Sequence, residues 1–413
     1  MKERVSTPLL RFGGFSEDWR IVRLGSVLTI LNGFAFSSRH AVESGVRWVK
    51  IADVGIHKMK KDSLSFLPVG FLRSHSKFIL RKGDCVIALT RPILNSRLKI
   101  AMIDDEFDGA LLNQRVGKLV TSNHLPFIYY LLQQDRLVAI IESNIAGSDP
   151  PNLSPNEIND IRVTLPILAE QQKIATFLTA VDNKIQLLEK KKGLLEQYRK
   201  GVMQKIFNRE IGFKDDDGNE CSDWEELELG KISLSVSNGL SIPQNSMKRG
   251  VKVTRIETIS SRSINLDRVG YVETNENIDD YKLQKGDLLF SNINSVAHIG
   301  KVVLVDKDYD LFHGMNLLRI RLDRSKVDPR FIAIQLGSSK YKVRFETICN
   351  RAVNQASINQ TELRKTRLLV PVYKEQCRIA GFFSSIDNKI SQVSRQLELT
   401  RQYKKGLLQK MFI

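Results

Sequence analysis

The chain has 413 residues, of which 42% are hydrophobic and 26% are charged, and this ordinary globular composition excludes a fully disordered or collagen-like chain. At roughly 150 residues per domain, the length suggests two or three domains. Lys and Arg number 63 and Asp and Glu 46, and the resulting net charge of +17 favours a polyanionic partner, either nucleic acid or an anionic membrane surface.

The membrane alternative has little support in the sequence. There is no run of about 18 apolar residues, so no transmembrane helix is expected. The first six residues lack the apolar core of a signal peptide. The four scattered cysteines form no C-x-x-C pair and are expected to be reduced thiols. They are Cys85, Cys221, Cys349 and Cys377. We therefore predict a cytoplasmic protein.

In chain order, composition and pattern predict six parts. They are an N-terminal arm at 1–14, a globular segment at 15–166, a long helix at 167–207, a polar linker at 208–220, a second globular segment at 221–371 and a second long helix at 372–413. Each globular segment is predicted to be an α+β domain with a mixed sheet. The expected strands are 46–51, 85–89, 98–103, 251–256, 288–290 and 301–305, and the expected shorter helices lie near 126–142 and 329–346.

The two long helices are predicted from heptad spacing. Two interleaved series of apolar residues recur every seven positions, which puts them on one narrow stripe that needs a partner helix to leave water. The predicted helix–helix seam residues are Ile174, Leu178, Val181, Ile185, Leu188, Leu195, Val202, Ile206, Ile379, Phe383, Ile386, Ile390, Val393, Leu397, Leu407 and Met411, and the exceptions in the series are Lys192, Arg199, Thr400 and Lys404. A single stripe would fit an ordinary amphipathic core helix. Two matched stripes favour a coiled coil of one helix with the other.

The second half of the chain repeats the first. Trp19 recurs as Trp224, 205 residues later, and the stretch 182–185 recurs at the same offset as 387–390. The offset drifts inside the globular segments, which have therefore diverged more than the helices. A duplicated chain can fold with pseudo-twofold symmetry and present two similar surfaces to two copies of one partner.

The loops that follow the strands at 85–89 and 288–290 contain residue types that suit base edges. Arg can pair with guanine and Asn with adenine in the major groove. The candidate DNA-binding residues are Thr90, Arg91, Asn95, Ser96, Arg97 and Lys99 in the first copy, and Ser291, Asn292, Asn294, Ser295 and His298 in the second. A polar surface loop is the alternative for any single residue. That the loop differs between copies fits two domains that bind different sequences.

Searches for catalytic motifs return no convincing site. The stretch 149–152, Asp-Pro-Pro-Asn, resembles an amino-methyltransferase motif but lacks its aromatic residue. The six histidines have no metal-binding spacing, and there is no Walker A sequence or G-x-S-x-G elbow. Asp104, Asp105 and Glu106 could hold Mg²⁺, but a solvated turn fits them better. We predict no catalytic residue and no metal site.

The repeated motifs resemble a known family. Two copies of Trp…Leu-Gly…Asn-Gly, then Lys-Gly-Asp, then Pro…Glu-Gln…Ile-Ala…Asp-Asn-Lys-Ile, and finally Gln-Lys-x-Phe look like the specificity subunit of type I restriction–modification systems. The resemblance covers essentially the whole chain.

The resemblance implies a fold and a function. The globular segments would be two tandem mixed α/β target recognition domains, each binding one half of a bipartite asymmetric target in double-stranded DNA. The helices would pack as an antiparallel coiled coil that sets the gap between the half-sites and docks two modification subunits, which restriction subunits join. No cofactor is implied on this chain, because S-adenosylmethionine would belong to the modification subunits, and ATP and Mg²⁺ to the restriction subunits. The methyl acceptor would be an adenine flipped out of the duplex.

Two other functions stay open at this point. A self-sufficient DNA methyltransferase or nuclease would need a cofactor or metal site. A coiled-coil nucleic-acid-binding scaffold would not explain why the globular segments have diverged while the helices match.

Overall fold

The computed structural model describes residues 7–62, 64–145, 150–213, 223–260, 263–296, 298–352 and 355–413. They divide into two compact units, and the division falls inside both long helices. Unit 1 contains Met1–Lys190 and Ser394–Ile413, and unit 2 contains Lys191–Val393. Each unit is therefore built from parts of both halves of the chain.

Unit 1 contains a four-stranded antiparallel sheet and a second, mixed sheet. The first sheet has the order β2 (Thr29–Asn32), β10 (Val116–Val120), β5 (Cys85–Ala88), β8 (Ile100–Met102), and the second has the order β4 (Phe66–Leu67), β3 (Val46–Val49), β9 (Leu111–Leu112), with β3 parallel to β9. Two strand pairs complete the unit: β1 (Arg20–Arg23) with β11 (Arg162–Leu165), and β6 (Ile93–Leu94) with β7 (Arg97–Leu98). The short helices are α1 (Leu24–Val27), α2 (Phe71–Ser74), α3 (Leu125–Leu131), α4 (Asp135–Ile145) and α5 (Pro155–Asn159).

Unit 2 repeats the four-stranded sheet with the same arrangement of equivalent strands. Its order is β13 (Ser233–Asn238), β19 (Leu318–Leu322), β16 (Leu288–Phe290), β18 (Val302–Leu304). The other strands form the sets β12 (Glu225–Glu228) with β22 (Arg367–Val370), β14 (Val251–Val253) with β15 (Gly270–Val272), and β17 (Ile293–Asn294), β21 (Gln355–Ser357), β20 (Asn350–Ala352). The short helices are α7 (Pro329–Leu336), α8 (Ser339–Ile348) and α9 (Gln360–Arg364).

The structure corrects two details of the predicted elements. Strand β3 does not alternate between buried and exposed residues, since all four of its residues are buried. Even Arg47 is covered, and its guanidinium lies over the Phe107 ring, 4.7 Å from the ring centroid. Each predicted shorter helix is two helices. The break between α7 and α8 falls at Gly337 and Ser338, where glycine is a poor helix former and serine suits the start of the next helix.

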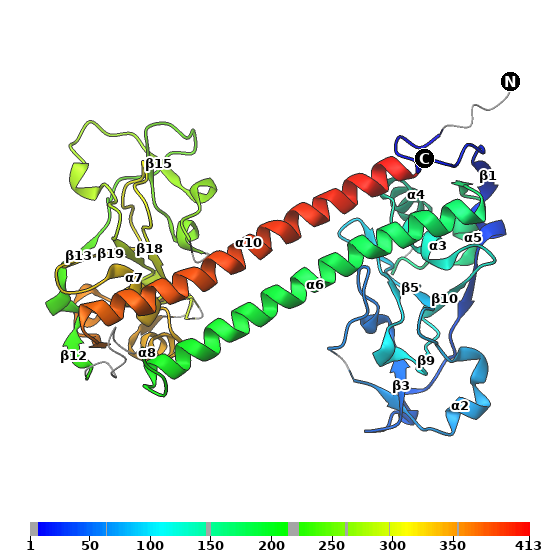
Figure 1. The fold of residues 1–413 in the computed structure, drawn as a ribbon, viewed down its shortest axis with the longest axis horizontal. Helices are drawn as coiled ribbons and strands as arrows, with labels where there is room; N and C mark the ends of the chain where they lie inside the picture. The colour runs from blue at the N-terminus through cyan, green and yellow to red at the C-terminus, as the bar shows by residue number, and fades with distance from the viewer. Residues whose placement is uncertain are drawn as a thin grey trace. The chain divides into compact units, whose positions relative to one another are not determined.

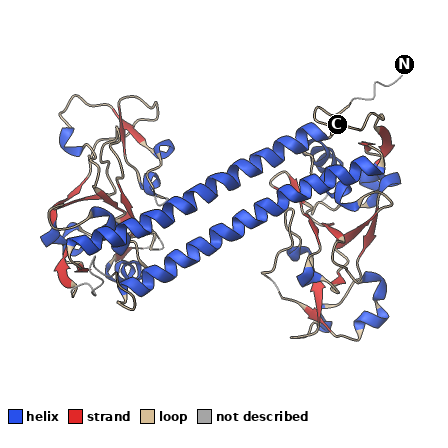
Figure 2. Cartoon of the chain, viewed as in Figure 1, coloured by secondary structure: helices blue, strands red, loops and turns tan. Residues whose placement is uncertain are grey.

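The two long helices are confirmed. Helix α6 (Leu168–Phe207) has 40 residues and α10 (Tyr373–Met411) has 39, each spanning about 60 Å at 1.5 Å per residue. In unit 1 the first part of α6 lies beside the last part of α10 (Figures 1 and 2). Asp182 pairs there with Lys404, and Glu189 with Arg401. From the first pair to the second, the residue number rises on α6 and falls on α10, so the two helices are antiparallel.

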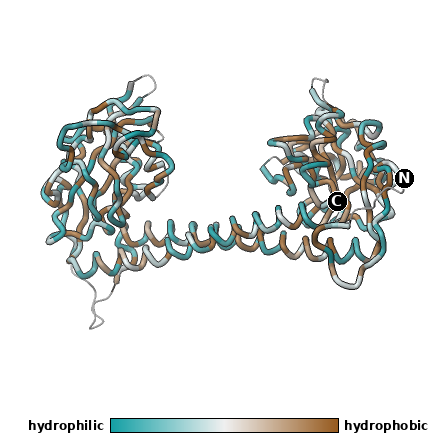
Figure 3. The backbone as a smooth tube through the Cα atoms, turned by 90° about the horizontal axis from the view of Figure 1, so that it is seen from above, coloured by the Kyte–Doolittle hydropathy of each residue, from teal (hydrophilic) through white to brown (hydrophobic). Residues whose placement is uncertain are grey.

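None of the sixteen predicted seam residues is exposed. Twelve are buried, and Ile185, Leu195, Val202 and Ile390 are half-buried. Figure 3 shows apolar residues recurring along both helices between hydrophilic ones. The heptad stripe is therefore the buried face of each helix, and that it forms a helix–helix seam stays a prediction.

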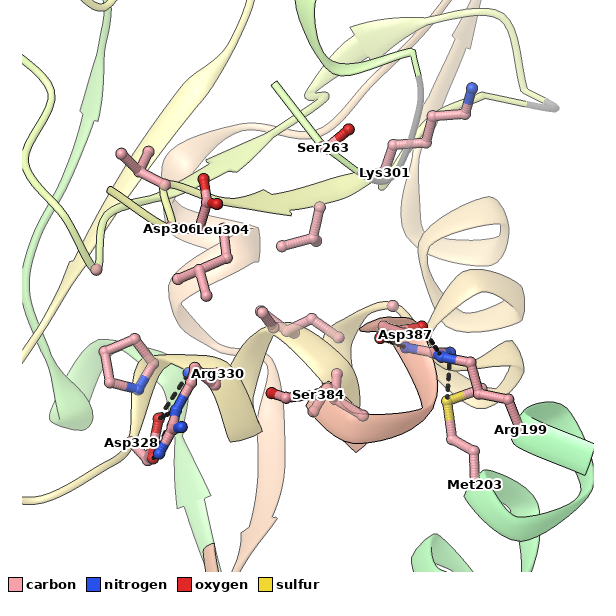
Figure 4. Close-up of a pocket in the computed structure, with 18 of the residues that line it drawn as sticks. Arg199, Met203, Ser263, Lys301, Leu304, Asp306, Asp328, Arg330, Ser384 and Asp387 are labelled. Atoms are coloured by element: carbon pink, nitrogen blue, oxygen red, sulfur yellow. Dashed lines mark hydrogen bonds and ion pairs between the residues drawn. The ribbon is translucent and has the colours of Figure 1, made fainter. Parts of the chain in front are cut away.

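Two of the heptad exceptions are charged residues that pair with acids. In unit 2, Arg199 Nε and Nη2 donate to the carboxylate oxygens of Asp387 at 2.7 and 3.0 Å, a pair visible in Figure 4. In unit 1, Lys404 Nζ lies 2.8 Å from Asp182 Oδ1. Both members of one pair are related to those of the other by the 205-residue offset, so the duplication has preserved the same ion pair twice.

Each long helix ends inside the core of the unit opposite to the one in which it begins. Phe412, just after α10, packs in unit 1 against Trp19 and Phe127, at ring-centroid distances of 6.5 and 5.2 Å. Phe207, at the end of α6, packs in unit 2 against Trp224 and Phe331, at 6.1 and 5.9 Å. The repeated Gln-Lys-x-Phe motif thus supplies an aromatic residue to each core.

The predicted N-terminal arm fastens the two helices of unit 1 together. Leu10 N–H donates to the Lys410 carbonyl at 2.8 Å. Arg11 Nε and Nη2 each lie 2.8 Å from the buried carboxylate of Glu170. Residues 1–6 of the arm, and residues 214–222, which include most of the predicted linker and Cys221, lie outside the described residues.

Candidate nucleic-acid interface

The candidate loop of unit 1 is a tight β-hairpin. Strands β6 and β7 pair Ile93 with Leu98 and Leu94 with Arg97. The two residues between them, Asn95 and Ser96, have φ angles of 51° and 54°. Two successive left-handed residues are the geometry of a type I′ turn, which matches the twist of a two-stranded ribbon.

The hairpin presents most of the predicted residues to solvent. Arg91, Asn95, Ser96 and Arg97 are exposed, and Thr90 and Lys99 are half-buried. The buried side chain of Leu98, 1% exposed, anchors the ribbon. Arg91 also has a left-handed φ of 46°, which is costly for a residue with a side chain and is typical of functional sites.

Positive charge gathers at the base of this hairpin. Burial lowers the pKa of Lys99, and the neighbouring charges of Lys60 and Arg91 lower it further. The Lys99 amine donates to the Thr90 carbonyl at 3.5 Å. Within the described part of the chain, no carboxylate pairs with Lys60, Arg91 or Lys99. A phosphate group would relieve this crowding of like charges.

Lys60 also belongs to this basic cluster, although it lies outside the two loops predicted to bind DNA. It follows the turn at His57, which has a left-handed φ of 59° and whose carbonyl accepts a hydrogen bond from Tyr129 Oη at 3.2 Å. Burial, and then the charges of Lys404 and Arg97, lower the pKa of His57 to about 3, so its ring is neutral beside the hairpin. The basic run 57–61 was the available sequence signal.

The candidate loop of unit 2 is built differently, and two of its predicted contacts must be corrected. Ser291 and Asn292 are 0% and 8% exposed. Ser291 Oγ accepts a hydrogen bond from Asn294 Nδ2 at 3.2 Å, and the Asn292 carbonyl accepts one from Ile358 N–H at 2.9 Å. They are buried because β17 pairs with the distant strand β21 instead of forming its own hairpin. Ser295 and His298 are exposed, and Asn294 is half-buried.

The acidic cluster considered as a magnesium site is occupied by lysines. Lys61 Nζ lies 3.5 Å from Asp104 Oδ2 and 2.5 Å from Glu106 Oε2, and Lys82 Nζ lies 2.6 Å from Asp105 Oδ1. Over the described ranges, no group of three His, Cys, Asp or Glu residues could hold a metal ion. Asp149 of the methyltransferase-like stretch lies outside these ranges. The acidic cluster is therefore a charge-paired turn.

A cavity of about 1110 Å³ lies in unit 2, between β18, α7 and the long helices (Figure 4). Two of its carboxylates are held by arginines: Asp387 by Arg199, and Asp328 by Arg330 at 2.5 Å. A third carboxylate of the lining, Asp306, accepts a hydrogen bond from Tyr309 Oη at 2.6 Å.

Comparison with known proteins agrees with this duplicated architecture. The family model described as "Type I restriction modification DNA specificity domain" matches twice, at residues 16–197 and 221–401. These matches cover most of the chain, which therefore belongs to the family of type I restriction–modification DNA specificity proteins and carries two tandem copies of its domain.

Individual relatives match either half or nearly all of the chain. The putative type I restriction enzyme MjaX specificity subunit of Methanocaldococcus jannaschii is 43% identical over 210 residues, which is 50% of this chain and 49% of the relative. The match therefore spans only about half the length of that relative. The EcoKI specificity subunit of Escherichia coli is 24% identical over 97% of this chain and 89% of its own.

A solved structure shares the fold. The type I restriction–modification S subunit from M. genitalium superposes with a TM-score of 0.65 at 15% identity, covering 99% of both chains. Among the helices of the described residues, none is long and apolar enough to cross a membrane.

Proposed function

We propose that this chain is the DNA sequence-specificity subunit of a type I restriction–modification complex, and that each recognition domain binds one half of a bipartite asymmetric target. The observation that carries the proposal is the contrast between scaffold and loop. The two units have four-stranded sheets with the same arrangement of strands. At the same point of that sheet, after β5 and β16, one unit carries a basic hairpin and the other a loop paired to β21. Equivalent scaffolds with different loops suit recognition of two different sequences.

The long helices are proposed to set the gap between the half-sites and to dock two modification subunits. The support for docking is an apolar pair that appears on both helices with the same exposure. Leu194 and Tyr198 of α6 are 55% and 54% exposed, and Leu399 and Tyr403 of α10 are 54% and 55% exposed. The members of each pair are four residues apart and so adjacent on the helix surface. Two equivalent patches suit two copies of one partner.

The chemistry is proposed to reside on other subunits. S-adenosylmethionine would be bound by the modification subunits, and ATP and Mg²⁺ by restriction subunits that join the complex. The residues of this chain would bind and position DNA, with adenine as the methyl acceptor. The same proposal places the protein in the cytoplasm, with no membrane partner.

The test is co-expression with a modification subunit, followed by genome-wide mapping of methylated adenines. A split, asymmetric motif is expected. A stable complex that methylates a contiguous motif, or methylation by the purified chain alone, would contradict the proposal. Insertion of one helical turn beside Leu195 is expected to change the gap and preserve both half-sites. Altered half-sites with an unchanged gap would contradict the spacer role of the helices.

A further inference from the structure

The loops of unit 1 around His57 and the β6–β7 hairpin concentrate left-handed backbone conformations. Within the described residues, seven non-glycine residues have a positive φ, and four of them are His57, Arg91, Asn95 and Ser96. The hairpin loop of unit 1 contains three of these four, whereas the corresponding loop at 291–296 of unit 2 contains none. Asn95 and Ser96 need this conformation for their type I′ turn. At Arg91 and His57 it is costly and must be held by the surrounding structure, as is typical of functional sites.

The same two loops bring together cations without acidic partners. Lys99 is tied into the base of the hairpin, because its N–H donates to the Pro92 carbonyl at 2.7 Å and its own carbonyl accepts from Ala88 N–H at 3.0 Å. The positive charges of Lys60 and Arg91 repel its ammonium group and lower its pKa. The adjacent Lys61 is different, since it is already paired with Asp104 and Glu106. The loops therefore hold a distinct cluster of available positive charge at Lys60, Arg91 and Lys99.

Arg97 lies beside the turn of the hairpin, away from the cations at its base. It lies on β7, directly after the turn and opposite Leu94, and it is exposed. A two-stranded ribbon fits the major groove of B-DNA, where an arginine can donate two hydrogen bonds to the O6 and N7 atoms of guanine. The cations at the base of a ribbon inserted in this way would lie near the groove edge, where the phosphates are.

We propose that the β6–β7 hairpin enters the major groove, that Arg97 contacts a guanine of the half-site bound by unit 1, and that Lys60, Arg91 and Lys99 bind the flanking phosphates. This inference rests on the proposed function and divides its unit 1 site into one specificity-determining residue and a phosphate clamp. The stretch between β16 and β18 of unit 2 contains no arginine, so this loop offers no equivalent of Arg97.

The experiment uses the full chain in complex with a modification subunit. Arg97→Ala is expected to relax the methylation motif at one guanine of one half-site and to leave the other half-site unchanged. The double variant Lys60→Ala/Lys99→Ala is expected to preserve the motif. It should weaken binding to all duplexes and reduce the slope of log affinity against log salt by about 1.8, for two phosphate contacts.

Lys61→Ala is the matched control, because this neighbour of Lys60 is already neutralised, and its effect on affinity and salt slope should be small. Thermal unfolding of each variant complex distinguishes lost DNA contacts from lost folding. The division of roles is overturned if Arg97→Ala weakens binding with an unchanged motif, if the double variant alters the motif, or if Lys61→Ala lowers affinity and salt slope as much as the double variant does. A wild-type complex that methylates no split motif would instead contradict the proposed function itself.

Discussion

Phe412→Ala tests the unusual composition of unit 1. Phe412 is 5% exposed and packs against both Trp19 and Phe127. Truncating a buried phenylalanine costs about 3–5 kcal/mol. That range already includes lost ring pairs, which contribute about 0.5–1.5 kcal/mol each beyond their buried area. Because Phe412 makes two such pairs, we expect a loss in the upper part of the range, about 4–5 kcal/mol in the free energy of unfolding. The loss should fall on unit 1, although Phe412 belongs to the second copy of the repeat.

Hydrogen exchange followed by mass spectrometry measures this, because it reports opening free energies for separate parts of the chain. Peptides from the sheet of unit 1, such as those that contain β5 and β10, should lose protection, and peptides from β16 and β19 in unit 2 should not. Phe207→Ala is the matched variant, with the opposite expectation. The reasoning is refuted if Phe412→Ala destabilises unit 2 as much as unit 1, or if its cost in unit 1 is under about 1 kcal/mol, well below the cavity range.

Three further predictions concern a buried histidine, the exposed apolar pairs and the buried charges of the helices. Burial lowers the pKa of His313 to about 4; the unfolded state therefore binds the proton more tightly, and stability falls as the pH drops from 6.5 towards 4. Between pH 7.5 and pH 5.0, the free energy of unfolding measured by denaturant titration should fall by about 2 kcal/mol less in His313→Gln than in wild type. An equal fall in both proteins would contradict this. The double variant Tyr198→Ser/Tyr403→Ser should weaken co-purification of the modification subunit without changing the helical circular dichroism signal. Unchanged co-purification would contradict the proposed docking role of these residues. Lys404→Ala removes the cation beside the half-buried Asp182, which keeps its hydrogen bond from Tyr130 Oη, and should cost about 1.5–3 kcal/mol of unfolding free energy. Arg401→Ala, at an exposed pair, should cost about 1 kcal/mol or less, and similar costs would contradict the distinction.

Sequence periodicity was sufficient to predict the long helices and which face of each is buried. Heptad spacing determines which face of a helix is apolar, and the seam residues are indeed buried or half-buried. The exceptions Arg199 and Lys404 looked like defects in the pattern. Their acidic partners, Asp387 and Asp182, lie on the other helix, so no search along a single helix could have explained them.

The details of the candidate site were less accessible to sequence reasoning. Ser291 and Asn292 are buried because β17 pairs with a strand more than 60 residues later, and nothing local signals this pairing. Asn95 is a residue type that tolerates the left-handed region, but Arg91 is not, so its conformation is imposed by the surrounding loop. Lys60 joins Lys99 only through tertiary structure. The boundaries 15–166 and 221–371 remain predictions of the repeat pattern.

The exchange of helix ends also bears on the order in which the protein can fold during synthesis. Unit 2 is one continuous stretch, Lys191–Val393, whereas unit 1 needs Ser394–Ile413 in addition to its first 190 residues. A nascent chain therefore completes the core around Trp224 before the core around Trp19, although Trp19 is made first. Until Phe412 is made, Trp19 and Phe127 lack the ring that packs against both of them, so the half of the chain that is synthesised first is the last to complete its core.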